Sequence, residues 1–189
     1  MDDETRHADE LTAHQDEEQQ VSVHADDVKQ TGDHLVRNMF WTVLICGVAL
    51  DRAVKWFEVA GIGVGQTVEA IPGVLNLSHV QNRGVGFGLL EGVVWVPILI
   101  AVLVCAAIAC AYLRLRPLPK LVAVALGLLG AGAIGNLIDR LFFGHVIDLF
   151  EIAFIRYPVF NIADSMVTVG SILLVFWLLF KSGTERESG

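Results

Sequence analysis

The sequence lacks the patterns of the common metal, redox and nucleophile sites. Its three cysteines, Cys46, Cys105 and Cys110, have neither CxxC spacing nor a nearby histidine cluster, and they indicate no disulfide framework. There is also no HExxH zinc helix, no Walker loop and no Ser-His-Asp pattern. We therefore expect no metal and no cofactor. What remains is carboxylate chemistry or a role without catalysis.

Basic residues are scarce, and the charge is unevenly distributed along the chain. Residues 1–35 hold eleven acidic side chains against Arg6 and Lys29, whereas the remainder is nearly neutral, with eleven basic and ten acidic groups. Nucleic-acid binding needs a basic face, so no nucleic-acid partner is expected. The acidic segment also has few large apolar side chains to bury, which predicts a disordered tail over 1–35.

Long apolar runs make up most of the remaining chain, which is 54% hydrophobic overall. In lipid, a segment must satisfy its own backbone hydrogen bonds, so spans of this kind are helices. We predict an all-α membrane protein, a four-transmembrane-helix bundle over 36–181 followed by a short tail, 182–189. Runs of the length that a bilayer requires occur at about 38–58, 93–113, 119–138 and 164–180.

The loops between these runs predict the orientation. Arg114-Leu-Arg-Pro-Leu-Pro-Lys120 carries three positive charges, which places it in the cytoplasm together with both chain termini. Loops 59–92 and 139–163 then face outward. The first contains several glycines and Pro72, and residues 74–80 alternate like a half-buried strand. We therefore expect a small extracytoplasmic β-rich loop domain.

Ionisable and amide side chains gather near the outer ends of the expected spans. On a helix, Asp51 shares a face with Lys55, and Asn136 shares a face with Asp139 and Arg140. The first pair is either an ion pair that snorkels near the interface or a contact for substrate or lipid. The second group can tie down the following loop, bind lipid phosphate or take part in catalysis.

Two further aspartates lie in the second outward loop and at the start of the last span. Asp148 follows a turn at Gly144, and Asn161 suits a helix N-cap with Asp164 in the first turn. They can be a solvated loop charge and a capping residue, respectively. If the two carboxylates meet in a partly dry site, they share a proton and can activate water for peptide hydrolysis, with Asp164 as the base.

Two other classes of function stay open on the residues alone. One is a small transporter or channel whose intramembrane polar groups bind cations or protons. The other is an assembly factor in which Asp139, Asp148 and Asp164 only cap helices. The sequence has no internal repeat, which an inverted-repeat transporter would show.

Six short motifs follow one another along 38–181. They are Asp51-Arg-Ala-Val-Lys55, Asn76-Leu, Asn82-Arg-Gly-Val-Gly-Phe-Gly88, Gly135-Asn-Leu-Ile-Asp-Arg140, Gly144-His-Val-Ile-Asp148 and Phe160-Asn-Ile-Ala-Asp164. In this order they resemble the lipoprotein signal peptidases (signal peptidase II), aspartic proteases of the bacterial inner membrane.

The resemblance implies roles for individual residues. Asp148 and Asp164 would be the catalytic pair, and Asp139, Gly84 and Gly88 would be structural. Supporting or substrate-binding roles would fall to Asn76, Asn82, Asn136, Arg140, Asn161, Asp51 and Lys55. Two positions depart from the family pattern, because Arg52 stands where glutamine is usual and Gly86 where alanine is usual. We expect both to alter only local packing.

The resemblance also implies an activity and its partners. The enzyme would be an aspartic endopeptidase that removes the signal peptide from a prolipoprotein, cutting just before a lipobox cysteine that already carries diacylglyceryl. Membrane lipids would surround it, and globomycin-like cyclic peptides would block it. It would act in the bacterial cytoplasmic membrane with its site toward the extracytoplasmic face. Four helices can enclose one site, so we expect a monomer.

Overall fold

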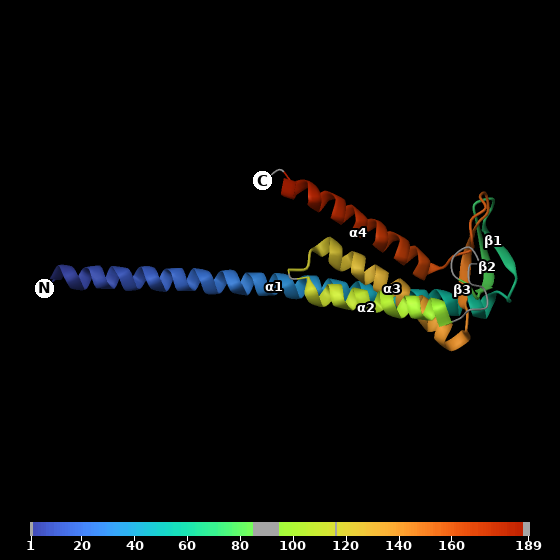
Figure 1. Ribbon diagram of the computed structural model, residues 1–189, viewed down its shortest axis with the longest axis horizontal. Helices are drawn as coiled ribbons and strands as arrows, with labels where there is room; N and C mark the ends of the chain where they lie inside the picture. Colours follow the sequence, from blue (N-terminus) through green and yellow to red (C-terminus); the bar gives the residue numbers. More distant parts are fainter. Residues whose placement is uncertain (1, 85–94, 116, 187–189) are drawn as a thin grey trace.

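The computed structural model describes residues 2–84, 95–115 and 117–186. It consists of four helices with a three-stranded sheet at one end of them (Figure 1). The start of α1 and the end of α4 both lie toward the opposite end. The elements in chain order are α1 (Asp2–Gly61), β1 (Thr67–Ile71), β2 (Leu75–Asn82), α2 (Trp95–Arg114), α3 (Lys120–Phe143), β3 (Val146–Ile152) and α4 (Ile162–Arg186).

Three helices of the described part are long and apolar enough to cross a membrane: α2, α3 and α4 as far as Phe180. They coincide with three of the four apolar runs in the sequence. Outward side chains of α2 and α4, such as Leu103 and Phe176, are apolar and exposed, which suits a lipid environment. The run at 38–58 lies inside α1, where charged residues interrupt it, so the count of four spans stays a prediction.

The N-terminal part of α1 differs from the disordered tail predicted for 1–35. The helix begins at Asp2 and runs as one rod that projects well beyond the other helices (Figure 1). Residues 2–31 contain no proline and no glycine, and alanine, glutamate and glutamine recur among them. These residues favour helix, and the apolar content that we used to predict disorder does not measure that preference.

Helix α3 lies at the centre of the bundle and packs against α1, α2 and α4. Glycines bring the helices close together. A side-chain carbon at Gly127 would lie 3.0 Å from the backbone oxygen of Phe40, and one at Gly170 would lie 2.9 Å from that of Ala125. In lipid, such close backbone contact is a main source of attraction between helices.

Helix α3 also extends past its predicted end near residue 138, so Asp139 and Arg140 both lie on the helix. Gly144 ends it with a φ of 71°, and its N–H donates to the oxygen of Arg140 at 3.2 Å. Glycine adopts this left-handed conformation at little cost. Strand β3 starts two residues later, so this turn leads the chain directly from α3 into the sheet.

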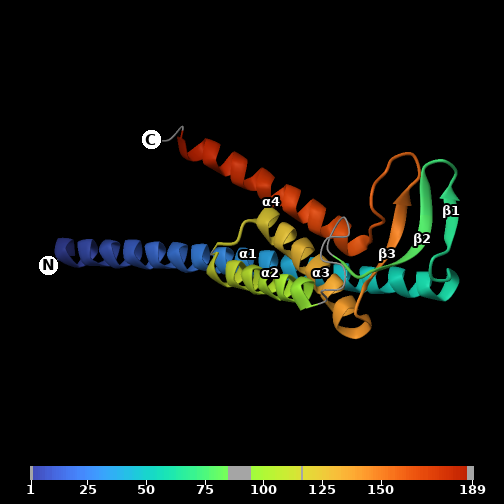
Figure 2. The same cartoon turned by 45° about the vertical axis from the view of Figure 1, so that its right-hand side comes forward.

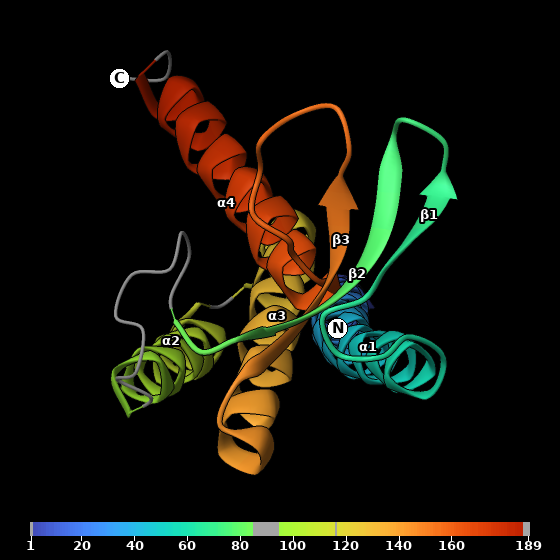
Figure 3. The same ribbon diagram turned by 90° about the vertical axis from the view of Figure 1, so that its right-hand side faces the viewer.

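The three strands form an antiparallel sheet in the order β1-β2-β3. Figures 2 and 3 show the strands side by side at the end of the helices. The sheet confirms the small β-rich unit predicted in loop 59–92. Its third strand, β3, comes from the other loop predicted to face outward, 139–163. The β2–β3 register pairs Val80 with Asp148 and Asn82 with Val146. This pairing brings the end of β2 to Asp148.

Candidate active site

Asp148 lies on β3 and is 1% exposed, which excludes a solvated loop charge. Each of its carboxylate oxygens accepts a hydrogen bond from an amide. Asn82 Nδ2 donates to Oδ2 at 2.8 Å, and Asn161 Nδ2 donates to Oδ1 at 2.6 Å. The donors come from β2 and from the residue before α4, so three separate segments meet at this carboxyl group.

Asp164 lies in the first turn of α4 and does act as a capping residue. Its Oδ2 accepts the Asn161 N–H at 3.3 Å, and its own N–H donates to Asn161 Oδ1 at 2.9 Å. This reciprocal pair is the arrangement of a capping box, with Asn161 as the predicted N-cap. The other carboxylate oxygen of Asp164, Oδ1, accepts a hydrogen bond from Asn136 Nδ2 at 2.8 Å. Capping therefore occupies only one of the two oxygens.

Asn161 and Asn136 connect the two carboxylates. Asn161 is 1% exposed, and its Nδ2 lies 3.2 Å from Asn136 Oδ1 in addition to its hydrogen bond with Asp148. Asn136 in turn donates to Asp164. The two carboxylates are thus linked through neutral amide groups.

Burial raises the pKa of Asp148 to about 6. The Asn82 hydrogen bond lowers this pKa, the negative charge of Asp164 raises it, and the Asn161 hydrogen bond and the positive charge of Lys55 lower it by smaller amounts. A carboxyl group with a pKa this close to neutrality can hold and release a proton during a reaction.

A second pair of aspartates, Asp51 and Asp139, is fully buried beside the first. Lys55 Nζ lies 3.1 Å from Asp51 Oδ2 and 2.7 Å from Asp139 Oδ2, and Arg52 also pairs with both carboxylates. The predicted Asp51–Lys55 ion pair therefore forms. Lys55 is only 3% exposed, so the pair is inside the protein and does not snorkel.

One alternative for Asp139 and Arg140 was that they tie down the loop after α3, and Asp139 does so, because its Oδ2 accepts the Ile147 N–H at 3.2 Å. Arg140 is directed elsewhere. Its Nη1 points back along α3 toward the Asn136 backbone oxygen, at 3.4 Å. Adjacent positions on a helix point in different directions, and Asp139 faces α1. The cations that hold Asp139 come from that helix.

Comparisons with known proteins decide the family. The sequence profile described as "Signal peptidase (SPase) II" matches residues 43–180. The chain belongs to the signal peptidase II family. The protein named lipoprotein signal peptidase in Geobacillus thermodenitrificans (strain NG80-2) is 39% identical over 150 residues, which cover 78% of this chain and 94% of that relative. Its counterpart in Lactiplantibacillus plantarum is also 39% identical over 150 residues, covering 77% and 99% of the two chains.

Solved structures agree with this assignment. The chain described as "Bacterial membrane enzyme structure by the in meso method at 2.3 A resolution" has a TM-score of 0.74 and 30% identity. The match covers 78% of this protein and 91% of that chain. Membership in the signal peptidase II family indicates a membrane protease involved in lipoprotein processing, and it favours this class over a transporter or an assembly factor.

The two β2 asparagines that the family resemblance singled out lie in different surroundings. Asn82 reaches Asp148, as described above. The amide of Asn76 lies 3.5 Å from Glu151 Oε2, across the sheet on β3. Ser78 donates to the same Glu151 oxygen at 2.6 Å. The structure thus brings Asn82 to Asp148 and places Asn76 in a separate polar group on the sheet.

The glycines of the Asn82 motif are only partly described. The Gly84 N–H donates to Asn82 Oδ1 at 3.0 Å, which leaves the amide nitrogen of Asn82 directed at Asp148. This contact gives Gly84 a structural role in orienting the amide. Gly86 and Gly88 lie outside the described residues.

An open groove of about 950 Å³ borders Asp148. Residues 80–84 form one part of its lining, and residues 151–159 form another. Arg83 and Arg156 supply positive charge there, and the loop side chains include Phe154 and Tyr157. Of the pair Asp148 and Asp164, Asp148 lines this groove.

Sequence reasoning missed the positions of two charged residues. Arg52 was expected to alter only local packing, but it contacts both buried aspartates of the second pair. Charge balance could have indicated this, because Arg52 and Lys55 in an apolar run need more than one anion. Glu58 is 5% exposed, and neither carboxylate oxygen has a hydrogen-bond partner among the described residues. No sequence pattern marks its burial.

Proposed function

We propose that this protein is an aspartic endopeptidase that removes the signal peptide from diacylglyceryl-modified prolipoproteins, cutting just before the lipidated cysteine. The observation that carries the proposal is the pair Asp148 and Asp164, which we call the dyad. Amide groups link the two carboxylates at the sheet end of apolar helices. The two relatives named lipoprotein signal peptidase support the substrate class.

In the proposed reaction, a water molecule binds between the two carboxyl groups. Asp164 is ionised and accepts a proton from this water, because the positive end of the α4 dipole favours its charged form. Asp148 is protonated and donates a hydrogen bond to the scissile carbonyl oxygen, which its raised pKa supports. The water oxygen then attacks the carbonyl carbon while Asp148 transfers its proton to the carbonyl oxygen, which forms a neutral tetrahedral intermediate with two hydroxyl groups.

Collapse of this intermediate completes the reaction. Asp164 returns its proton to the leaving nitrogen, the C–N bond breaks, and Asp148 recovers its proton as the carbonyl re-forms. The products are a signal peptide with a new carboxyl end and a lipidated cysteine with a free amino group. Because one chain supplies both carboxylates, the proposed active unit is a monomer.

The orientation of the helices agrees with a substrate that arrives from the membrane. Arg114 and Lys120 flank the α2–α3 loop, and the positive-inside rule assigns that loop to the cytoplasm. The sheet lies at the other end of these helices, which corresponds to the extracytoplasmic face (Figure 1). The groove beside Asp148 can hold extended polypeptide there, and globomycin-like cyclic peptides would compete for it.

The test is cleavage of a diacylglyceryl-modified prolipoprotein by the purified protein in detergent. Wild type should release the signal peptide, and Asp148→Asn and Asp164→Asn should each reduce the rate by at least roughly 1,000-fold while remaining folded. Normal turnover in either folded variant would refute the dyad. Failure of the wild type to cut the lipidated substrate would refute the proposed activity.

A further inference from the structure

Each member of the buried pair Asp51 and Asp139 holds the backbone of a residue that directly precedes a dyad aspartate. Asp139 Oδ2 accepts the N–H of Ile147 at 3.2 Å, and Ile147 precedes Asp148. Asp51 Oδ1 accepts the N–H of Ala163 at 3.1 Å. Ala163 precedes Asp164. The positions of the Ile147 and Ala163 backbones therefore depend on the positions of Asp139 and Asp51, respectively.

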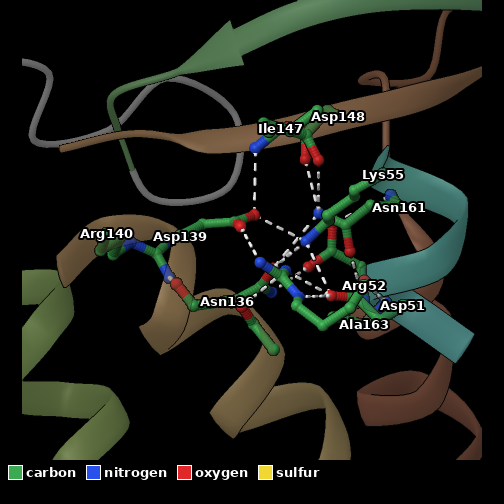
Figure 4. Close-up of polar contacts among 12 residues, drawn as sticks. Asp51, Arg52, Lys55, Asn136, Asp139, Arg140, Ile147, Asp148, Asn161 and Ala163 are labelled. Atoms are coloured by element: carbon green, nitrogen blue, oxygen red, sulfur yellow. Dashed lines mark hydrogen bonds and ion pairs between the residues drawn. The ribbon is translucent and has the colours of Figure 1, made fainter. Parts of the chain in front are cut away.

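Arg52 joins these two anchoring carboxylates (Figure 4). Its Nε and Nη2 donate to Asp51 Oδ2 at 3.2 and 2.6 Å, and its Nη1 donates to Asp139 Oδ1. Nη2 also lies 3.0 Å from the backbone oxygen of Gly135 on α3. A guanidinium is planar and its donors keep fixed angles, so these contacts hold Asp51 and Asp139 at a fixed separation.

Lys55 contacts the same two carboxylates but cannot fix their separation as Arg52 does. Its ammonium is a compact charge on a flexible stem, and it attracts both aspartates without fixing their geometry. The cluster contains two cations and two anions, so loss of Arg52 would leave one excess negative charge in a buried place. Such charge repels the two aspartates from each other.

The neighbouring helix leaves space for this arrangement. A side-chain carbon at Gly135 would lie 2.8 Å from Asp51 Oδ2 and 3.2 Å from the side-chain carbon of Ala163. Only a residue without a side chain fits between Asp51 and the start of α4. The absence of a side chain at this position lets α1, α3 and α4 meet at the cluster.

We infer that Arg52 is a positioning residue that sets the separation of Asp148 and Asp164 through Asp51 and Asp139. This inference rests on the proposed function, because it assigns Arg52 a part in the same cleavage reaction. Two carboxyl groups that share one water must be placed to within a fraction of an ångström, and a displacement of about 1 Å can cost about 100-fold in rate. Arg52 touches neither dyad carboxylate itself, so it acts through the backbone.

The experiment measures kcat and KM of Arg52→Met and Arg52→Lys on the lipidated prolipoprotein, with Arg37→Met as the matched control. Methionine has a long side chain without an N–H donor. Arg37 lies on the same helix, but stacks on Tyr112 away from the site. Arg52→Met should lower kcat roughly 10- to 100-fold and leave KM within about twofold. Arg52→Lys should recover part of this loss, and Arg37→Met should match wild type.

Several outcomes would overturn the inference. One is a folded Arg52→Met enzyme with unchanged kcat, and another is a loss confined to KM. If Arg52→Met does not fold, Arg52→Lys decides, because full wild-type kcat would show that the forked geometry is unnecessary. If Asp148→Asn abolishes cleavage and Arg52→Met leaves it unchanged, this inference alone is refuted. Absence of cleavage by wild type refutes it together with the proposed function.

Discussion

Four aspartates lie at the sheet end of this bundle, three of them buried and Asp164 half-buried, and they fall into two pairs with different partners. Asp148 and Asp164 accept hydrogen bonds from amides, mainly those of Asn82, Asn136 and Asn161. Asp51 and Asp139 are paired with the cations of Arg52 and Lys55. The same side chain is thus held by neutral donors in one pair and by full positive charges in the other.

The partners determine what each pair can do. A cation nearby stabilises the charged form of a carboxylate, so an ion-paired aspartate is suited to holding structure. A neutral amide orients the carboxylate but compensates its charge less, and burial then favours the protonated form. The raised pKa of Asp148 shows this second effect. Acid–base chemistry needs a group of this kind.

The largest expected effect comes from Asp139→Asn. The asparagine can still accept the Ile147 hydrogen bond, but Arg52 and Lys55 lose one of their two anions. Breaking a buried ion pair in this way typically costs about 3–5 kcal/mol. We expect a loss of this size in the free energy of unfolding in detergent, measured by thermal unfolding. Asp33→Asn makes the same chemical change on α1, near Arg37 and Tyr112 and away from this cluster, and is the control. Equal stability of both variants would contradict the assigned ion pairs.

Aspartate to asparagine at position 148, in the amide-bonded pair, should instead increase the free energy of unfolding. The unfolded chain ionises Asp148 near the ordinary value of 3.8, whereas the folded protein does so at about 6. Stability from the protonated form is therefore present at low pH and is lost as the pH rises through 6. Asp148→Asn cannot ionise and so does not suffer this loss. We therefore expect its free energy of unfolding to exceed that of wild type by about 1–3 kcal/mol near pH 8, and this difference should shrink toward pH 4.

This gain is measured by thermal unfolding of wild type and Asp148→Asn across that pH range. A destabilisation near pH 8 that equals that of Asp139→Asn would show that both aspartates are held as ions. The comparison between the two pairs would then be wrong. A gain that does not vary with pH would exclude the protonation of Asp148 as its cause.

A smaller effect is expected from Asn82→Ala. The Asn82 hydrogen bond lowers the pKa of Asp148, so removing it raises that pKa. If Asp148 is the acid, the decline of kcat/KM on the alkaline side should move to higher pH. Losing one hydrogen bond to a charged group is worth about 1.5–3 kcal/mol at most. Gln81→Ala, an exposed neighbour on β2, is the control, and a shift to lower pH in Asn82→Ala would contradict the assignment.

Much of the fold could be predicted from the sequence because it depends on local properties. The lengths of the apolar runs predicted α2, α3 and α4, and the alternation of apolar and polar residues over 74–80 predicted β2. The N-cap role of Asn161 followed from its place before an apolar run. Each of these features is decided within a few residues. The two dyad aspartates were chosen by resemblance to the family, since spacing alone left three candidates.

What the sequence did not predict involves partners far apart in the chain. Arg52 and Asp139 are separated by 87 positions, and nothing near either residue indicates the other. The cations that pair with Asp139 are Arg52 and Lys55 of α1, and not its neighbour Arg140 on α3. Glu58 is buried on α1, a helix that contacts β3, a strand far away in the sequence.

The sequence by itself determined where apolar helices form and which carboxylates and amides gather near one end of them, since length, hydropathy and capping act locally. Only the tertiary structure decided which aspartates are held by amides and which by cations. The reason is that these partners come from α1, α3, α4 and the sheet, which are far apart in the chain and meet only in the folded protein. Cations hold the two aspartates that accept backbone N–H groups before Asp148 and Asp164, and amides hold the pair that we propose as catalytic.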